Sequence, residues 1–166
     1  MRFRLRHLQQ TLADHVEAHL ASLGWKDDPP PWDIAPITFR EVQTSKIELM
    51  EPTLVSTSVE SEGDRELEQL GGGMWKIVHM VIFDVVAEKP SIALSLTGDI
   101  RGSLEDVIIP LFDYTTSSPV EVAGSMIEAI QLETVVGQTG GSTSAVDIKR
   151  SWRSVLATIE LTISED

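Results

Sequence analysis

The stretch M-W-K-I-V-H-M-V-I-F-D-V-V-A-E, residues 74–88, decides the fold of this chain. It follows three glycines, contains neither Gly nor Pro, and is rich in Val and Ile. β-Branched residues favour a strand here over a helix of the same length. Two alternating apolar faces result: Trp75, Ile77, Val81, Phe83 and Val85 on one, and Met74, Val78, Met80, Ile82 and Val86 on the other. This pattern predicts a central strand that is covered on both sides.

Length and composition predict one globular domain over residues 1–166, because 166 residues with 42% hydrophobic content can bury a core. The chain has no cysteine, which excludes disulfides, thiol catalysis and cysteine–zinc sites. No apolar run is long enough to span a bilayer, and the arginine-rich N-terminus lacks the continuous apolar segment of a signal peptide. We therefore expect no membrane association.

The formal charge of −13 comes from 13 basic and 26 acidic residues. Such an excess disfavours nonspecific binding to a phosphate backbone. Solubility alone is the commoner reason for an excess of this kind. Acidic residues cluster in the middle part of the sequence, at Glu60, Glu62, Asp64, Glu66 and Glu68, whereas basic residues gather near the two ends of the chain.

Hydrophobic periodicity predicts two helices and four further strands. Residues 5–23 and 90–109 carry apolar residues at spacings of three and four, and Gly24 and Pro110 are suited to end these helices. Residues 34–43, 52–60, 126–138 and 152–163 read as strands, the last with the clearest alternation. The order α-β-β-β-α-β-β predicts an α+β fold, in which two helices pack on one face of a mostly antiparallel β-sheet.

The segments between these elements read as connections. Residues 25–33 contain three prolines, which favour an extended spacer whose Trp25 and Trp32 pack on the domain, although a docking peptide for a proline-binding module is an alternative. Residues 60–73 and 138–147 are expected to be mobile loops, and residues 111–119 another loop.

Motifs for chemistry are weak. His15 and His19 have the i, i+4 spacing of a metal pair but lack the H-E-x-x-H order and a third ligand. We expect His79 to be a core residue and His7 to be exposed. The glycine-rich G-Q-T-G-G-S-T, residues 137–143, lacks the lysine of a phosphate-binding loop. We therefore expect no catalytic, metal or cofactor site.

The closing sequence R-S-W-R-S-V-L-A-T-I-E-L-T-I, residues 150–163, resembles the last strand of tail terminator proteins from long-tailed, siphovirus-type actinobacterial phages. The chain length, the N-terminal helix and the central strand, followed by a helix that runs into I-I-P-L-F-D-Y at residues 108–114, agree with this family. The proline run at residues 29–31 and the short strand at residues 52–60 have no counterpart in that pattern.

The resemblance implies a virion protein that forms a homohexameric ring on the tail tube, ends tube polymerisation and joins the tail to the head connector. Its partners would be further copies of itself, the major tail tube protein and the connector or stopper protein, with assembly in the host cytoplasm. DNA would pass through the acidic lumen without specific binding, and no cofactor would be involved. Candidate subunit or partner contacts are the acidic Glu60, Glu62, Asp64, Glu66 and Glu68 and the basic Arg150 and Arg153.

Three alternatives stay open at this stage. The chain could be another phage neck or minor tail protein, because these share such an α+β plan. It could be a small-molecule or peptide-binding module, which predicts a well-formed apolar pocket. It could be an enzyme that uses His79 with Asp84 or another acid, which requires these side chains to converge. For the candidate contact residues, the alternative is ordinary surface charge.

Overall fold

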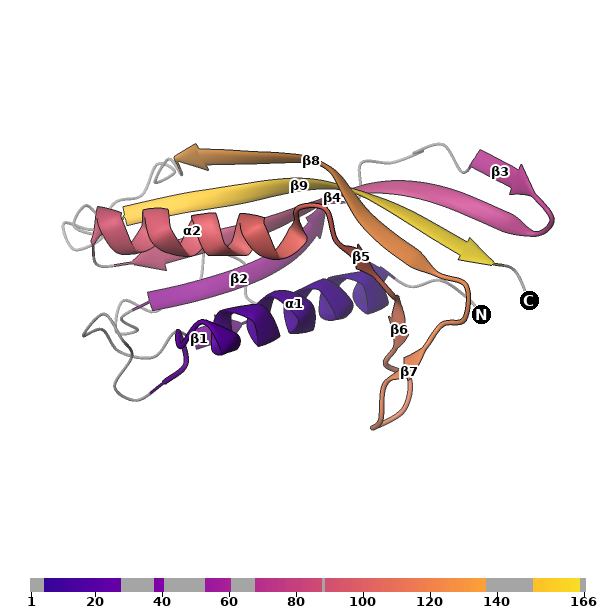
Figure 1. The fold of residues 1–166 in the computed structure, drawn as a ribbon, viewed down its shortest axis with the longest axis horizontal. Coiled ribbons are helices and arrows are strands. Elements are labelled where there is room, and N and C mark those ends of the chain that lie inside the picture. Colours follow the sequence, from indigo (N-terminus) through magenta and orange to yellow (C-terminus); the bar gives the residue numbers. More distant parts are fainter. Residues whose placement is uncertain are drawn as a thin grey trace.

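The computed structural model describes residues 5–27, 38–40, 53–60, 68–87, 89–136 and 151–164. Two helices and nine strands lie in this part of the chain (Figure 1). Their order is α1 (Leu5–Ser22), β1 (Thr38–Arg40), β2 (Thr53–Glu60), β3 (Glu68–Gly71), β4 (Met74–Ala87), α2 (Pro90–Leu104), β5 (Ile108–Ile109), β6 (Phe112–Asp113), β7 (Val120–Glu121), β8 (Met126–Val136) and β9 (Ser151–Ser164).

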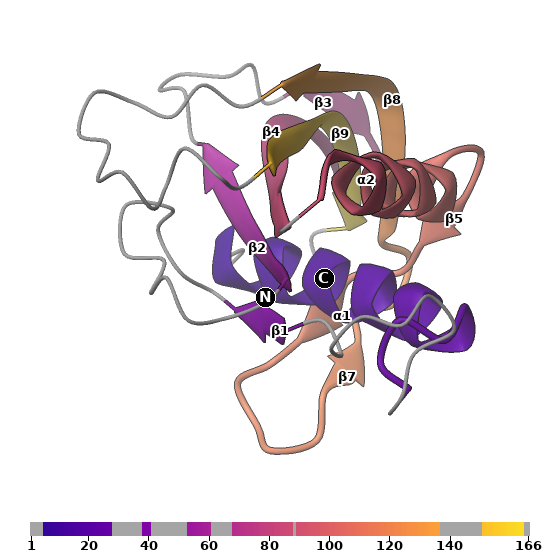
Figure 2. The ribbon, with the colours of Figure 1, turned by 90° about the vertical axis from the view of Figure 1, so that its left-hand side faces the viewer.

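The main sheet has the strand order β1-β2-β4-β9-β8-β5, and β3 pairs with the first residues of β4. Strands β6 and β7 form a separate two-stranded sheet. Every pairing is antiparallel except that of β1 with β2. The predicted α+β fold with a mostly antiparallel sheet is therefore confirmed, and Figure 2 shows both helices on the same side of the curled sheet.

Strand β4 lies at the centre of this sheet, as the sequence predicts, with β9 on one side and β2 and β3 on the other. Its alternate residues Val81, Phe83 and Val85 are fully buried beneath the helices. On the opposite face Val78 and Ile82 are half-buried and Val86 is 4% exposed. Both described helices pack on the first face, so the predicted cover of the second face is incomplete within the described part of the chain.

Helix α1 buries the predicted apolar stripe completely, at Leu8, Leu12, Val16 and Leu20. Gly24 follows the helix with a φ of 87°, a backbone conformation that glycine adopts without strain and that commonly ends helices. Trp25 is then 1% exposed, so the predicted packing of this tryptophan on the domain is confirmed, whereas Trp32 lies outside the described residues.

Helix α2 begins at Pro90 and is shorter than predicted, because it ends at Leu104 instead of residue 109. Asp106 has a φ of 56°, which a helix cannot accommodate, and Ile108 and Ile109 pair with β8 as strand β5. Apolar residues at positions 107–109 extend the helical spacing by coincidence. The pairing of Ile108 and Ile109 with β8 overrides this spacing.

Two predicted loops contain strands. Residues 68–71 form β3, which joins β4 through a two-residue turn at Gly72 and Gly73. Both turn glycines have positive φ, at 63° and 77°, as tight hairpin turns require. The predicted loop 111–119 includes β6, which pairs with β7. Residues 61–67 and the predicted loop 138–147 lie outside the described residues.

Candidate functional site

The outer side of β8 is the most conspicuous open edge of the described sheet. On its inner side β8 pairs with β9 from Met126 to Val136. On its outer side β5 covers only Ile127 and Glu128. We call the remaining residues 129–136 the β8 edge. No other described strand pairs with their outer backbone groups, and such groups readily accept a strand from another chain.

A register shift explains where this open edge begins. The pairing of β8 with β9 shifts between Ala129 and Gln131, so that Ile130 is an extra residue in the ladder. A bulge of this kind bends a strand and increases its twist. Ile130 is 53% exposed and lies two residues after Glu128, the last residue that β5 covers. The bulge thus lies at the start of the β8 edge.

The β8 edge is also apolar and carries little charge. Val135 is 41% exposed and Val136 is 68% exposed, and Glu133 is the only charged residue between Ile130 and Val136. Protein edges are commonly protected by lysine, proline or covering segments. Four of the eight exposed large apolar side chains in the described residues belong to β8, and Ile108 and Leu94 lie on its neighbours β5 and α2. Exposed apolar surface of this kind marks interaction sites.

The contact residues predicted from charge fall at two separate places. Glu68 pairs in register with Lys76 and Glu60 with Met80, whereas Arg153 pairs with Val85. The positions of Glu68 and Arg153 are therefore separated by nine residues along β4, which is roughly 30 Å at about 3.3 Å per residue. Among the described positions, the structure does not bring Glu68 and Arg153 together within one molecule. Glu62, Asp64, Glu66 and Arg150 lie outside the described residues.

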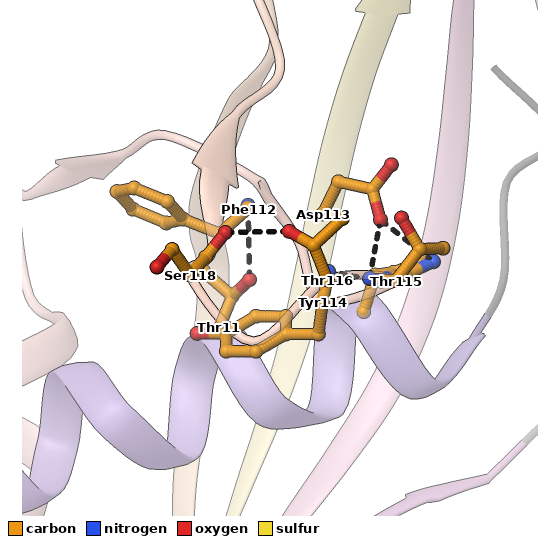
Figure 3. Close-up of polar contacts among 8 residues, drawn as sticks. Thr11, Phe112, Asp113, Tyr114, Thr115, Thr116 and Ser118 are labelled. Carbon is orange, nitrogen blue, oxygen red and sulfur yellow. Dashed lines mark hydrogen bonds and ion pairs between the residues drawn. The ribbon is translucent and has the colours of Figure 1, made fainter.

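Side chains of α1 hold the β6–β7 hairpin against that helix, and Figure 3 shows the contact of Thr11 with Phe112. Thr11 Oγ1 accepts a hydrogen bond from the Phe112 backbone N–H at 3.1 Å. His7 Nδ1 accepts one from the Tyr114 backbone N–H at 3.0 Å. The Tyr114 hydroxyl donates to a carboxylate oxygen of Asp14 at 2.7 Å. The hairpin is therefore fixed to the domain at three successive turns of one helix.

Two properties of this contact depend on burial. His7 is 3% exposed, so the prediction that it is exposed is wrong: the β6–β7 hairpin covers it. Burial, followed by the hydrogen bond to Asp14 and the negative charge of Asp14, raises the pKa of Tyr114 to about 12, against an opposing effect of the hydrogen bond to Thr11. Both effects favour the neutral phenol that donates to Asp14.

The remaining histidines form no catalytic or metal constellation among the described residues. His15 Nε2 lies 2.8 Å from the Ser103 carbonyl oxygen, which accepts its N–H and joins the two helices. No group of three potential ligands that could hold a metal occurs in the described part of the chain. His79 is buried on the helix-covered face of β4, as the core prediction requires.

The hypothesised pair of His79 and Asp84 does not form. The two residues are five positions apart on β4, whose pairing with β9 is uninterrupted, so they point to opposite faces of the sheet. On its own face, Asp84 accepts hydrogen bonds from Ser154 and from the Trp152 indole. This carboxylate fixes the start of β9 and does not orient a histidine.

Comparison with known proteins adds no family: neither protein-family models nor curated proteins match the chain. Neither described helix is long and apolar enough to cross a membrane. The β8 edge thus remains the feature that most directly suggests a role. Sequence reasoning missed it, because the strand order that leaves β8 uncovered is not encoded in local periodicity; the uncharged run Thr134–Val136 is its only local signal.

Proposed function

We propose that this chain is a structural virion protein of the tail terminator type, which assembles as a ring on the tail tube, ends its polymerisation and joins the tail to the head connector. The observation that carries the proposal is the β8 edge, where the described strands leave the outer backbone groups unpaired and where Val135 and Val136 are exposed. In a ring, each copy covers an edge of its neighbour, and the hazard of an open apolar edge is removed.

The acidic balance of the chain supports the same role. A ring multiplies the charge of −13 carried by each copy. A lumen of that sign repels the DNA backbone, so that DNA passes without adhering. In this proposal the acidic segment from Glu60 to Glu68 and the basic pair Arg150 and Arg153 contact the neighbouring subunit, the tube protein or the connector.

The positions of these residues are compatible with such contacts. Glu68 and Arg153 lie at positions toward opposite ends of β4, so each molecule can offer its acidic segment on one side and its basic residues on another. Contacts between unlike surfaces generate rings, whereas contacts between like surfaces close as dimers. The resemblance of residues 150–163 to tail terminators selects this role over other ring-forming proteins.

The test compares two lysine substitutions of valines with similar exposure. Val136→Lys places a charge on the β8 edge, and Val120→Lys places it on β7, where Val120 is 60% exposed. Light scattering is measured on each purified protein alone and with the candidate tube protein, and tube lengths are measured by electron microscopy. We expect wild type and Val120→Lys to form a hexamer, or to join tubes and cap them at fixed length.

Val136→Lys should weaken this assembly roughly tenfold or more, which corresponds to about 1.4 kcal/mol. The substitution is on the surface and should leave the fold intact, which circular dichroism checks. A wild-type protein that neither self-associates nor changes tube length would overturn the proposal. Equal assembly of the two lysine variants would show that the β8 edge is not the contact.

A further inference from the structure

The partner of the β8 edge can be specified, on the premise of the proposed ring. We propose that the β8 edge of one copy pairs with the outer edge of β1 in the next copy, so that a single sheet continues through successive subunits. A ring needs two different surfaces on each copy, which meet head to tail. Among the described strands, β1 is the last strand on one side of the main sheet, and the β8 edge is the part of β8 that β5 leaves uncovered on the other side, so the two are different surfaces of this kind.

Strand directions favour this pairing. β1 runs parallel to β2, β2 is antiparallel to β4, β4 to β9, and β9 to β8. β1 and β8 therefore run in opposite directions. When a second copy continues the sheet with its helices on the same side, its β1 lies antiparallel to β8 of the first copy. Antiparallel pairing is the arrangement of nearly the whole sheet and the more stable one per residue.

The β8 edge and β1 also lie at the same level along the strand direction. Val135 pairs with Ser154, Ser154 with Asp84, Asp84 with Ser56, and Ser56 with Arg40. These five residues form one row perpendicular to the strands. Adjacent copies can therefore bring Val135 of one molecule opposite Arg40 of the next without a large shift along the strand direction.

Charge distinguishes this contact from the symmetric pairing of two β8 edges. Glu133 is the only charged residue between Ile130 and Val136, and Arg40 is the only one in β1. Symmetric pairing of β8 with a second β8 gathers two copies of Glu133 at one edge, and nearby like charges destabilise strand pairing. Pairing of β8 with β1 brings Glu133 toward a strand of opposite charge. The charges thus select a head-to-tail contact over a two-fold dimer.

Cross-linking can test the contact without ambiguity, because the chain has no cysteine of its own. By the register of the sheet, the positions of Thr38 and Val135 fall on the same face. The row of Thr38 runs through Leu54 to Val86, and the row of Val135 runs through Ser154 to Asp84. Val86 and Asp84 are two residues apart on β4 and therefore share a face. Within one molecule, four strand spacings separate β1 from β8, which is about 19 Å at ~4.8 Å per spacing. A short bis-maleimide cannot bridge that separation, but it can bridge neighbouring strands offset by two residues.

The experiment mixes Thr38→Cys protein with Val135→Cys protein and adds the bis-maleimide, at high protein concentration and again with tube protein. We expect a covalent dimer in the mixture and none from either variant alone. Val120→Cys, on β7, is the matched control and should not cross-link to Thr38→Cys. A dimer from Val135→Cys alone would replace the proposal with symmetric β8 pairing. No dimer from the mixture under either condition would overturn the proposal.

A charge exchange provides an independent readout of the same contact. Glu133→Arg should weaken self-association several-fold, and the double variant Glu133→Arg with Arg40→Glu should restore it, as sedimentation equilibrium can measure. Absence of rescue would contradict the proposed pairing. Cross-linking and rescue without any effect on tube length would retain the head-to-tail contact and reject the terminator role. Tube capping without the cross-link would retain the terminator role and reject the head-to-tail contact.

Discussion

The indole N–H of Trp25 donates a hydrogen bond to Asp99 Oδ2 at 2.7 Å, and this bond joins the residue that follows α1 to the middle of α2. Trp25 is 1% exposed, so the bond is formed where water cannot easily replace it. It complements the contact of His15 with the Ser103 carbonyl farther along the same helix pair. The two helices are thus connected by polar contacts in the middle and at the C-terminal end of α2 as well as by their apolar sides.

Replacement of Trp25 by phenylalanine should test this connection. The phenyl ring retains most of the apolar burial but cannot donate to Asp99, and the loss of a hydrogen bond to a charged acceptor costs about 1.5–3 kcal/mol. We expect the free energy of unfolding, measured by urea denaturation, to fall by this amount. Asp99→Asn is the matched control, because its amide oxygen can still accept and the loss should be smaller. An equal loss in both variants would assign the stability to the charge of Asp99.

The two faces of β4 should respond differently to the same substitution. Val81 is fully buried beneath the helices, whereas Val78 lies on the half-buried face. Truncation of Val81 to alanine removes buried carbon atoms and leaves a cavity, at a cost of about 2–3 kcal/mol. Val78→Ala should cost about half as much. Equal losses in the free energy of unfolding would indicate that both faces of β4 are covered in solution.

The long elements of this fold were predictable because one periodicity runs through each of them. Buried residues recur every three or four positions along helix α1 and at about every second position along strand β9. In both elements the local sequence pattern and the final packing agree. Strands β5, β6 and β7 have two residues each, which is too short for any periodic signal. Their strand conformation depends on partners elsewhere in the chain, such as Ile127 for Ile109.

The candidate site was less predictable for the same reason. An edge is defined by strand order, and nothing in residues 129–136 specifies that β5 covers only the first part of β8. The burial of His7 depends on Tyr114, which is 107 residues distant in sequence. Charge clusters such as Glu60 to Glu68 are visible in a sequence, but the separation of Glu68 from Arg153 requires the register of β4.

Neutralisation of the acidic segment should affect assembly and not folding. The triple variant Glu62→Gln, Asp64→Asn and Glu66→Gln removes three charges and leaves the β3–β4 hairpin intact. We expect unchanged stability and a weaker dependence of tube capping on salt concentration, because screening acts on charge contacts between molecules. The matched control neutralises Glu17, Glu105 and Glu121, which lie on other elements. An identical salt dependence in wild type and the triple variant would remove the segment from the contact.

Substitution of His7 should release the β6–β7 hairpin. His7→Ala leaves the partly buried Tyr114 backbone N–H without its acceptor, which costs about 1–3 kcal/mol. His7→Asn can place an amide oxygen near the position of Nδ1 and should lose less. Limited proteolysis of the exposed residues 115–119, together with urea denaturation, measures both effects. If cleavage in this loop is equally slow in wild type and His7→Ala, the hydrogen bond does not hold the hairpin.

The stability of the domain should fall as the pH rises from 10 to 12. Tyr114 has a folded pKa of about 12 against an ordinary value of 10.0, because burial and Asp14 favour its neutral form. A group whose pKa is raised on folding stabilises the protein fully below its unfolded pKa, and this contribution disappears as the pH rises through the folded pKa. Since Tyr114 is the only tyrosine, the ultraviolet absorbance of its phenolate reports its titration directly.

We expect the absorbance midpoint near pH 12 in folded protein and near pH 10 in urea-unfolded protein. Tyr114→Phe should lack the part of the stability loss that the titration of Tyr114 causes in this pH range. The difference from wild type therefore separates the effect of Tyr114 from that of the lysines. Asp14→Asn should lower the folded pKa while leaving it above 10.0, because burial is the larger cause and remains. A folded midpoint near pH 10 would show that the hairpin leaves the Tyr114 ring in water, and the contact with α1 would then not persist in solution.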